Sequence, residues 1–127
     1  NSGRIRNRLG QLRHFPGWGG ASDKDRVRMM RQAGNFPIQS LGAHLTNLAA
    51  YHVDEFLTEN FKSLLFFQQH DSLLIDIHPK DKPEEVKGYA EKIMVVKTPR
   101  QYAPFLKVAL PVGASITKRW GEKDDEN

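Results

Sequence analysis

A histidine and an aspartate, His70 and Asp71, stand between two apolar runs at residues 64–69 and 72–78. Both runs are rich in β-formers and have about the length of a typical strand. We therefore predict two antiparallel strands with His70-Asp71 at their tight connection. A carboxylate held at the end of rigid strands suits magnesium, a hard cation that takes oxygen ligands. The pair can also be interpreted as an ordinary turn, because turns are usually polar.

The turn chemistry of this hairpin is unusual. Two-residue hairpin loops favour Asn-Gly or Asp-Gly, but here Asp71 is followed by Ser72 and no glycine is within reach. A local rule broken at the tip of an apolar hairpin is where a functional residue is expected.

Charge and composition limit the classes of partner. The chain has 127 residues, no cysteine and a net charge of +4. Residues 1–32 hold eight arginines and lysines against two aspartates, so the positive charge is concentrated at the front. This pattern predicts a polyanionic partner, usually phosphate, although a solvated charged surface is the alternative. The longest unbroken apolar run, 64–67, has four residues, so we expect no membrane span.

The front of the chain, 1–21, is predicted to form a basic β-ribbon and a loop. Residues 4–9 alternate strictly, which places Arg4, Arg6 and Arg8 on one side of a strand. Gly10 offers a turn, and 11–15 could return as the second strand. Arginine forks match phosphate oxygens well, so this face is predicted to contact phosphates.

Two helices are expected within 22–60. Ser22 is a good N-cap for a helix over about 23–33, which Gly34 would end. Pro37 suits the first turn of a second helix that reaches about residue 60.

Three polar residues, Arg31, Asn35 and Gln39, lie four apart across this predicted break. They would then converge at a helix–turn–helix corner rather than form one continuous helical stripe. The alternative is an N-cap role for Asn35 and a solvated first-turn position for Gln39.

After the hairpin segment, 61–79, we predict a helix and a final strand within 80–121. The helix should run from about Glu84 to Lys97, and 105–112 should form a strand, with Pro111 arguing for an edge or a strand end. The acidic tail, 122–127, is expected to be mobile. The expected fold class is α/β in the loose sense: a mixed α+β domain with an antiparallel hairpin packed on a long helix.

The order of these motifs resembles DNA polymerase family A. The run from Arg31 through Asn35, Pro37 and Gln39 to Ser40 resembles the family segment R-x-x-x-N-x-P-x-Q-G/S, and His70-Asp71 resembles its motif C, H-D-E. Gly3-Arg4-Ile5-Arg6 resembles the G-R-x-R strand upstream, and 108–120 resembles the closing strand and near-terminal tryptophan. The resemblance covers nearly the whole chain.

The resemblance implies a role in nucleotidyl transfer, as the C-terminal part of a polymerase palm. Asp71 would help to hold the catalytic Mg2+ pair, and His70 would lie near the primer-terminal backbone. The implied partners are a DNA primer–template and a dNTP. Contacts to the DNA would come from Arg4, Arg6, Arg8, Arg31, Asn35 and Gln39.

Departures from the family pattern imply an incomplete enzyme. Ser72 replaces the usual glutamate of motif C, and Ser40 replaces a glycine. The family's motif A aspartate and its nucleotide-binding helix have no counterpart here. We therefore expect a split subunit, spliced fragment or proteolytic piece of a bacterial or phage polymerase. It would be cytoplasmic, inactive without the portion carrying motif A, and prone to homo-oligomerise when isolated.

Two other functions compete with this one. A small basic nucleic-acid-binding protein would use the same arginines and the basic first helix without Asp71. A lone metal-dependent nuclease is disfavoured because Asp76, the nearest other acid, would lie on the opposite strand face from Asp71.

Overall fold

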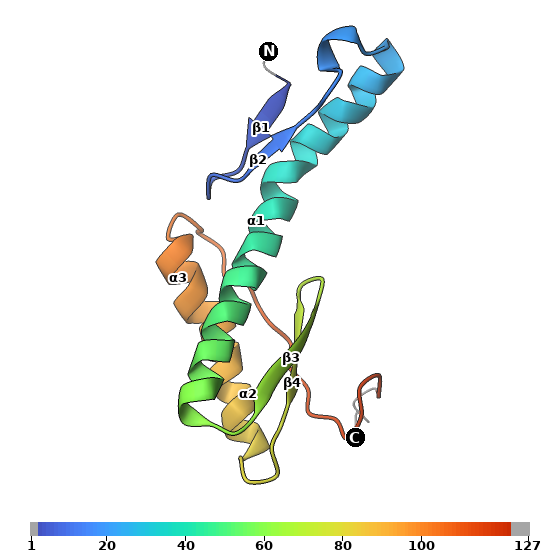
Figure 1. Ribbon diagram of the computed structural model, residues 1–127. Helices are drawn as coiled ribbons and strands as arrows, with labels where there is room; N and C mark the ends of the chain where they lie inside the picture. Colours follow the sequence, from blue (N-terminus) through green and yellow to red (C-terminus); the bar gives the residue numbers. More distant parts are fainter. Residues whose placement is uncertain (1–2, 123–127) are drawn as a thin grey trace. The chain divides into compact units, whose positions relative to one another are not determined.

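The computed structural model describes residues 3–122 and has the predicted mixed α+β fold (Figure 1). The chain divides into two compact units, residues 1–45 and 46–127. The first unit holds a two-stranded ribbon and the second holds the hairpin. The elements are β1 (Arg4–Arg6), β2 (Leu12–His14), the 3-10 turn η1 (Trp18–Gly20), α1 (Asp23–Asn60), β3 (Leu64–Gln69), β4 (Ser72–Asp76), α2 (Pro83–Lys92), the π turn η2 (Ile93–Lys97) and α3 (Thr98–Tyr102).

The basic ribbon forms as predicted, but with shorter strands. β1 pairs antiparallel with β2, so that Arg4 lies opposite His14 and Arg6 opposite Leu12. Asn7 holds the turn between them: its Oδ1 accepts hydrogen bonds from the backbone N–H groups of Leu9 and Gln11, at 3.0 and 2.9 Å. The side chain closes the loop from within, so β1 ends at Arg6.

The ribbon is fixed to the first half of α1 by a buried polar contact. Asn7 Nδ2 donates to the hydroxyl of Ser40 at 3.0 Å, and both side chains are buried. Beside this contact, the guanidinium of Arg13 lies over the rings of Phe15 and Phe36. Hydrogen bonding satisfies the buried amide and hydroxyl, which would otherwise be costly to bury.

The prediction of two helices within 22–60 is wrong, because α1 is one helix of 38 residues. Ser22 does cap its start: its hydroxyl accepts from the Asp25 N–H at 3.2 Å. Gly34 and Pro37 both lie inside the helix. An interior proline costs about 3 kcal/mol, but the buried Phe36 and Ser40 on either side of Pro37 pack under the ribbon. Tertiary contacts therefore outweigh the local break.

The core of the second unit lies between α1, the hairpin and α2. Its buried members are Val53 and Leu57 of α1, Val86 of α2 and Ile93 of η2. The remaining half-buried side chains that pack against this cluster are Phe56, Phe61, Leu65, Leu73, Ile75, Ile77, Ala90 and Met94.

The hairpin forms as predicted, with the last pair of its ladder between Gln69 and Ser72. Its register shifts between Leu65 and Phe67, which makes Phe66 an extra residue in β3. Such a bulge bends a strand and re-aims its side chains. Phe66 and Phe67 are both exposed as a result, by 55% and 45%.

The third helical region is longer than predicted, and the expected final strand is absent. α2 continues through η2 into α3, which ends at Tyr102 rather than near Lys97. A hydrogen bond of 2.8 Å between Tyr102 Oη and the buried His52 Nε2 fixes α3 to α1.

Residues 105–112 have no partner strand within residues 3–122, so they form no ladder. A strand requires a neighbour for its backbone groups, and Val108 is left 76% exposed. The predicted acidic tail begins at Glu122, and its residues 123–127 lie outside the described part of the chain. Among the described helices, none has the length and apolar character that crossing a membrane requires.

One carboxylate joins the two ends of the hairpin segment. Asp81 Oδ2 accepts from the Ser63 hydroxyl at 2.6 Å and from the backbone N–H groups of Ser63 and Lys62 at 2.7 and 2.8 Å. The Ser63 hydroxyl in turn accepts from the N–H of His78 at 3.0 Å. The start of β3 is thereby held to the segment that follows β4. These hydrogen bonds lower the pKa of Asp81, and the bond from the Ser63 hydroxyl has the largest effect.

We predict that Asp81→Asn lowers the urea midpoint of unfolding at neutral pH. The folded-state pKa of Asp81 lies below its unfolded value, so its contribution to stability is complete above about pH 4. That contribution is lost as the pH falls through the lowered pKa. Urea unfolding is followed by circular dichroism from pH 7 to pH 3. The difference in urea midpoint between the unaltered protein and Asp81→Asn should become smaller as the pH falls.

Asp76→Asn is the matched control, because Asp76 is an exposed carboxylate on β4. A difference in urea midpoint between Asp81→Asn and the unaltered protein that stays constant down to acid pH would contradict the stabilising role of the Asp81 carboxylate.

Candidate nucleic-acid and metal site

The hairpin tip presents His70 and Asp71 to solvent. Both side chains are exposed, and within the described residues neither has a hydrogen-bond or ion-pair partner. They are the two loop residues between the paired Gln69 and Ser72. The Asp71 carboxylate is therefore available to an external ligand, at the end of two paired strands.

The backbone at the tip is strained. His70 has a φ of 52°, and it is the only non-glycine residue with positive φ among residues 3–122. A turn with positive φ at its first central residue favours glycine there. For an L-residue with a side chain this conformation costs roughly 1–2 kcal/mol. The missing glycine noted in the sequence is therefore a real cost, of the kind that concentrates at functional sites.

The described residues do not assemble a metal-binding cluster around Asp71. In residues 3–122, no three histidine, aspartate or glutamate side chains gather closely enough to hold a metal ion. Asp76 pairs with Leu64 at the opposite end of the hairpin ladder, about five residues or ~16 Å along an extended strand. The described residues therefore do not form a metal site of three such ligands by themselves.

The predicted DNA contacts of the ribbon lie on its exposed side. Arg4 and Arg6 are exposed and alternate with the half-buried Ile5. Arg8 is also exposed, but it lies in the turn rather than on the strand. The structure thus keeps two guanidinium groups on one face of β1 and adds a third at its end.

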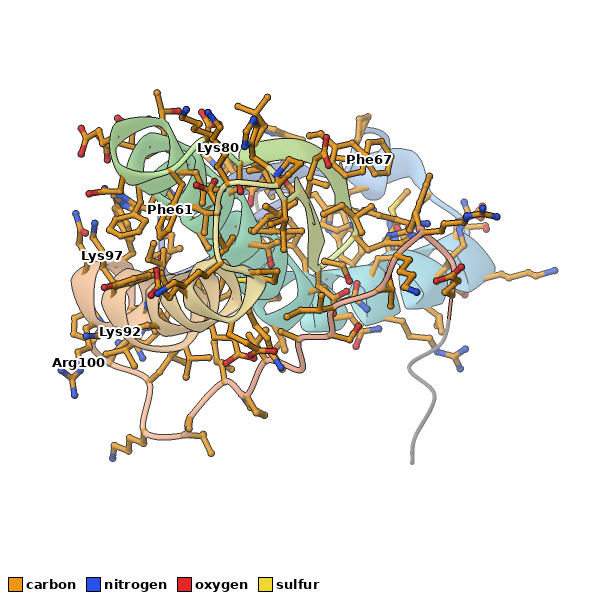
Figure 2. All side chains as sticks on the ribbon, turned by 90° about the horizontal axis from the view of Figure 1, so that it is seen from below. Phe61, Phe67, Lys80, Lys92, Lys97 and Arg100 are labelled. Carbon is orange, nitrogen blue, oxygen red and sulfur yellow. The ribbon has the colours of Figure 1, made fainter. Side chains whose placement is uncertain are left out.

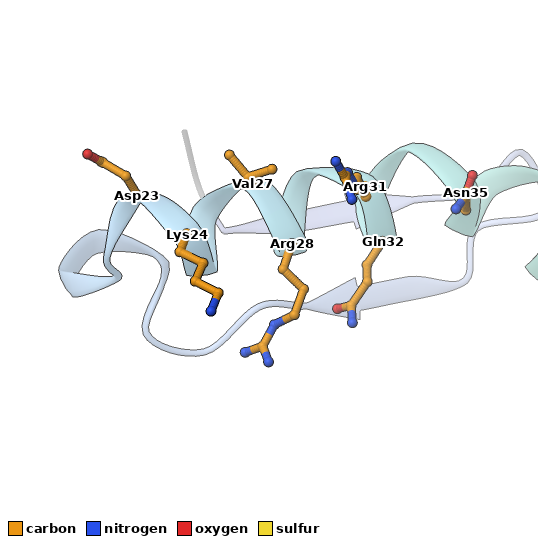
Figure 3. Close-up of a pocket in the computed structure, with 7 residues that line it drawn as sticks. All are labelled: Asp23, Lys24, Val27, Arg28, Arg31, Gln32 and Asn35. Atoms are coloured by element: carbon orange, nitrogen blue, oxygen red, sulfur yellow. The ribbon is translucent and has the colours of Figure 1, made fainter.

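Arg31, Asn35 and Gln39 are exposed positions of one continuous helix. Their spacing of four residues places them along one ridge of α1, which corrects the expected helix–turn–helix corner. Asn35 is also not an N-cap, because it lies inside the helix. An open hollow runs along this stretch, and Figure 3 shows Arg31 and Asn35 in the same row of side chains. Its lining residues are Asp23, Lys24, Val27, Arg28, Arg31, Gln32 and Asn35.

The residues that position this surface were not identified from the sequence. In the sequence nothing distinguishes Asn7, and Ser40 is only a small replacement for glycine. Their hydrogen bond nevertheless fixes the ribbon to α1. The signals that could have indicated them are an asparagine just before a glycine turn and a serine on the apolar side of a helix.

Residues 1–122 match the sequence profile of DNA polymerase family A. The match covers almost the whole chain, and the chain therefore belongs to this family.

Bacterial DNA polymerase I proteins are among its relatives. The chain is 33% identical to DNA polymerase I of Lactococcus lactis over 93 residues, which is 72% of this chain and 10% of that protein. It is 31% identical to DNA polymerase I of Helicobacter pylori over 114 residues, or 90% of this chain and 12% of that protein. The chain thus spans roughly a tenth of the length of these relatives.

We predict that His70→Gly stabilises the protein by about 0.5–1 kcal/mol. Glycine removes the cost of the left-handed backbone, about 1–2 kcal/mol, but brings its own entropic cost of about 0.5–1 kcal/mol. The free energy of unfolding in urea measures the difference.

The neighbouring substitution Asp71→Gly is the control, because Asp71 has no positive φ to relieve. It should destabilise by about 0.5–1 kcal/mol. Equal losses in the two variants would show that His70 carries no strain.

Proposed function

We propose that this chain is the C-terminal palm portion of a DNA-directed DNA polymerase, a fragment or split subunit that works together with the polymerase portion carrying motif A. The observation that carries the proposal is the exposed, unpartnered Asp71 at the hairpin tip of a chain that belongs to DNA polymerase family A. No group of three metal-ligating side chains forms among residues 3–122, and in this proposal the site is completed from elsewhere.

In this proposal Asp71 contributes one oxygen ligand to Mg2+, and the remaining protein ligands come from the partner. Magnesium binds well only where several oxygen ligands are arranged for it, so one carboxylate is insufficient. When bound, the metal supplies Lewis-acid stabilisation to nucleotidyl transfer from a dNTP. The role of this chain is to hold Asp71 at a fixed point on paired strands.

His70 and the polar residues of the first unit are proposed to position the DNA primer–template. His70 would contact the primer-terminal backbone, beside the metal ligand. Arg4, Arg6 and Arg8 would contact phosphates, which fix the position of a duplex without reading its sequence. Arg31, Asn35 and Gln39 would reach template or primer, where minor-groove acceptors lie at similar places for every base pair.

Exposed apolar side chains support the proposal that another part of the polymerase packs against this chain. Phe66, Phe67 and Val108 are 45–76% exposed, and large exposed apolar patches commonly mark interfaces. We propose that the polymerase portion carrying motif A and the nucleotide-binding helix covers such surface in the complete enzyme. Homo-oligomerisation is then expected when the chain is isolated. The cytoplasm of a bacterial or phage-infected cell is the proposed location.

The alternative is a basic nucleic-acid-binding protein without catalysis. The exposed arginines of the ribbon and of α1 favour it, and it requires nothing of Asp71. A test of Asp71 therefore separates the two functions.

We predict that the chain alone does not extend a primer, and that adding the polymerase portion carrying motif A restores magnesium-dependent extension. Asp71→Ala should lower that rate by about 1,000-fold, because metal stabilisation supplies several kcal/mol and each 1.36 kcal/mol corresponds to a tenfold change. Single-turnover extension of a labelled primer measures the rate.

Asp76→Ala is the control, and it should retain extension because Asp76 lies at the far end of the hairpin ladder. A second assay grafts residues 1–122 into the matching segment of Helicobacter pylori DNA polymerase I. Robust extension by Asp71→Ala in either assay would reject the catalytic assignment.

A further inference from the structure

The helical segment from α2 to α3 contains an irregular turn that changes which side chains share a face. In η2, Ile93–Lys97, the backbone follows a π-helical path with i→i+5 hydrogen bonds. One such turn acts like an extra residue in an α-helix, so every later side chain is set back by about 100°. The turn therefore decides the direction of all residues from Lys97 onwards.

Three cations are aligned by this turn. In a regular α-helix, Lys97 and Arg100 would follow Lys92 at i+5 and i+8, about 140° and 80° away. With one residue absorbed by the π turn, their effective spacing becomes i+4 and i+7, which is one face. In Figure 2 the labelled Lys92, Lys97 and Arg100 lie along the same edge of the helical segment. We call these three residues the basic stripe.

The same shift explains the buried side of the segment. Thr98 is completely buried, whereas its neighbour Lys97 is exposed. Because the π turn absorbs one residue, Thr98 lies at an effective spacing of i+4 from Ile93. It therefore shares the face of Val86 and Ile93, which belong to the core. Packing and the basic stripe therefore depend on the same turn.

Within residues 3–122 the basic stripe is not neutralised. In residues 3–122 none of its three side chains forms an ion pair, and all three are exposed. Glu85 lies on the same face two turns before Lys92, but its carboxylate is already 3.5 Å from the ammonium of Lys82. Three like charges on one helical face repel one another, so the arrangement favours an external polyanion.

We propose that the basic stripe binds the phosphate backbone of DNA, as a contact surface separate from the hairpin tip and the ribbon. The eight helical steps from Lys92 to Arg100 span about 12 Å, and one DNA strand carries a charge about every 3.4 Å along the axis. Three phosphates fit within that length. The inference goes beyond the proposed function and does not require Asp71.

DNA binding by the full chain tests the basic stripe. Anisotropy of a labelled duplex of about 20 base pairs is measured between about 50 and 200 mM salt. Each phosphate contact adds about 0.9 to the slope of log K against log salt. The triple variant K92Q/K97Q/R100Q should therefore reduce the magnitude of the slope by about 2 to 3. The contribution of the ribbon to the slope should stay the same.

Two variants control for net charge. K62Q/K80Q/K118Q removes the same charge from exposed lysines of the second unit and should change the slope by less than about 1. R100Q/Q101R keeps the net charge but moves the guanidinium about 100° around the helix, and should lower the slope by about 0.9. Circular dichroism confirms that each variant is folded.

Three results would overturn the proposal. The first is an equal loss of slope in the stripe and control triple variants. The second is no salt-dependent binding of the duplex by the unaltered chain. The third is a stripe variant that loses binding to phosphatidylserine vesicles and keeps its DNA affinity, which would assign the surface to lipid headgroups. Asp76→Ala, which lies outside the basic stripe and the hairpin tip, should bind DNA like the unaltered chain. DNA binding is measured without primer extension, so this test and the extension assay fail separately.

Discussion

A two-stranded hairpin is marginally stable on its own in water, and this constraint organises the second unit. Asp71 can serve as a fixed ligand only if β3 and β4 are held by something larger. Half-buried Leu65, Leu73 and Ile75 provide that support by packing against the buried cluster of Val53, Leu57, Val86 and Ile93. The position of one exposed carboxylate thus depends on a cluster of aliphatic side chains, because the hydrophobic contact is what makes the hairpin rigid.

The base of the hairpin is fixed by a different interaction. Asp81 collects three hydrogen bonds from Ser63 and Lys62, and Ser63 receives a fourth from His78. These groups join the segment before β3 to the segment after β4, so the two strands leave from a closed base. Apolar packing supports the sides of the hairpin and a carboxylate closes its base, while the tip remains open to solvent.

Irregular backbone concentrates in the parts of the second unit to which we assign functions. His70 has a left-handed φ at the tip, Phe66 is a bulge that turns two aromatic rings outward, and η2 aligns three cations. Bulges and π turns are recurrent near functional sites, and strained residues persist only where the surrounding structure holds them. Each of the three features determines what the surface offers to a ligand, and η2 also places Thr98 on the buried face.

The sequence alone was sufficient for the local elements. Alternation of arginines predicted the ribbon, two apolar runs predicted the hairpin, and Ser22 predicted the start of a helix, because each signal acts within a few residues.

The prediction failed where distant contacts compete with local preference. α1 continues through Pro37 because Asn7 and Arg13 pack over that stretch, and 105–112 forms no strand because a ladder needs a partner that residues 3–122 do not supply. For the candidate site, the sequence alone indicated the residues that we propose for the chemistry. Only the tertiary structure decided that Arg31, Asn35 and Gln39 share one helix and that a π turn places Lys92, Lys97 and Arg100 on one face, since side-chain direction depends on every turn of backbone between them.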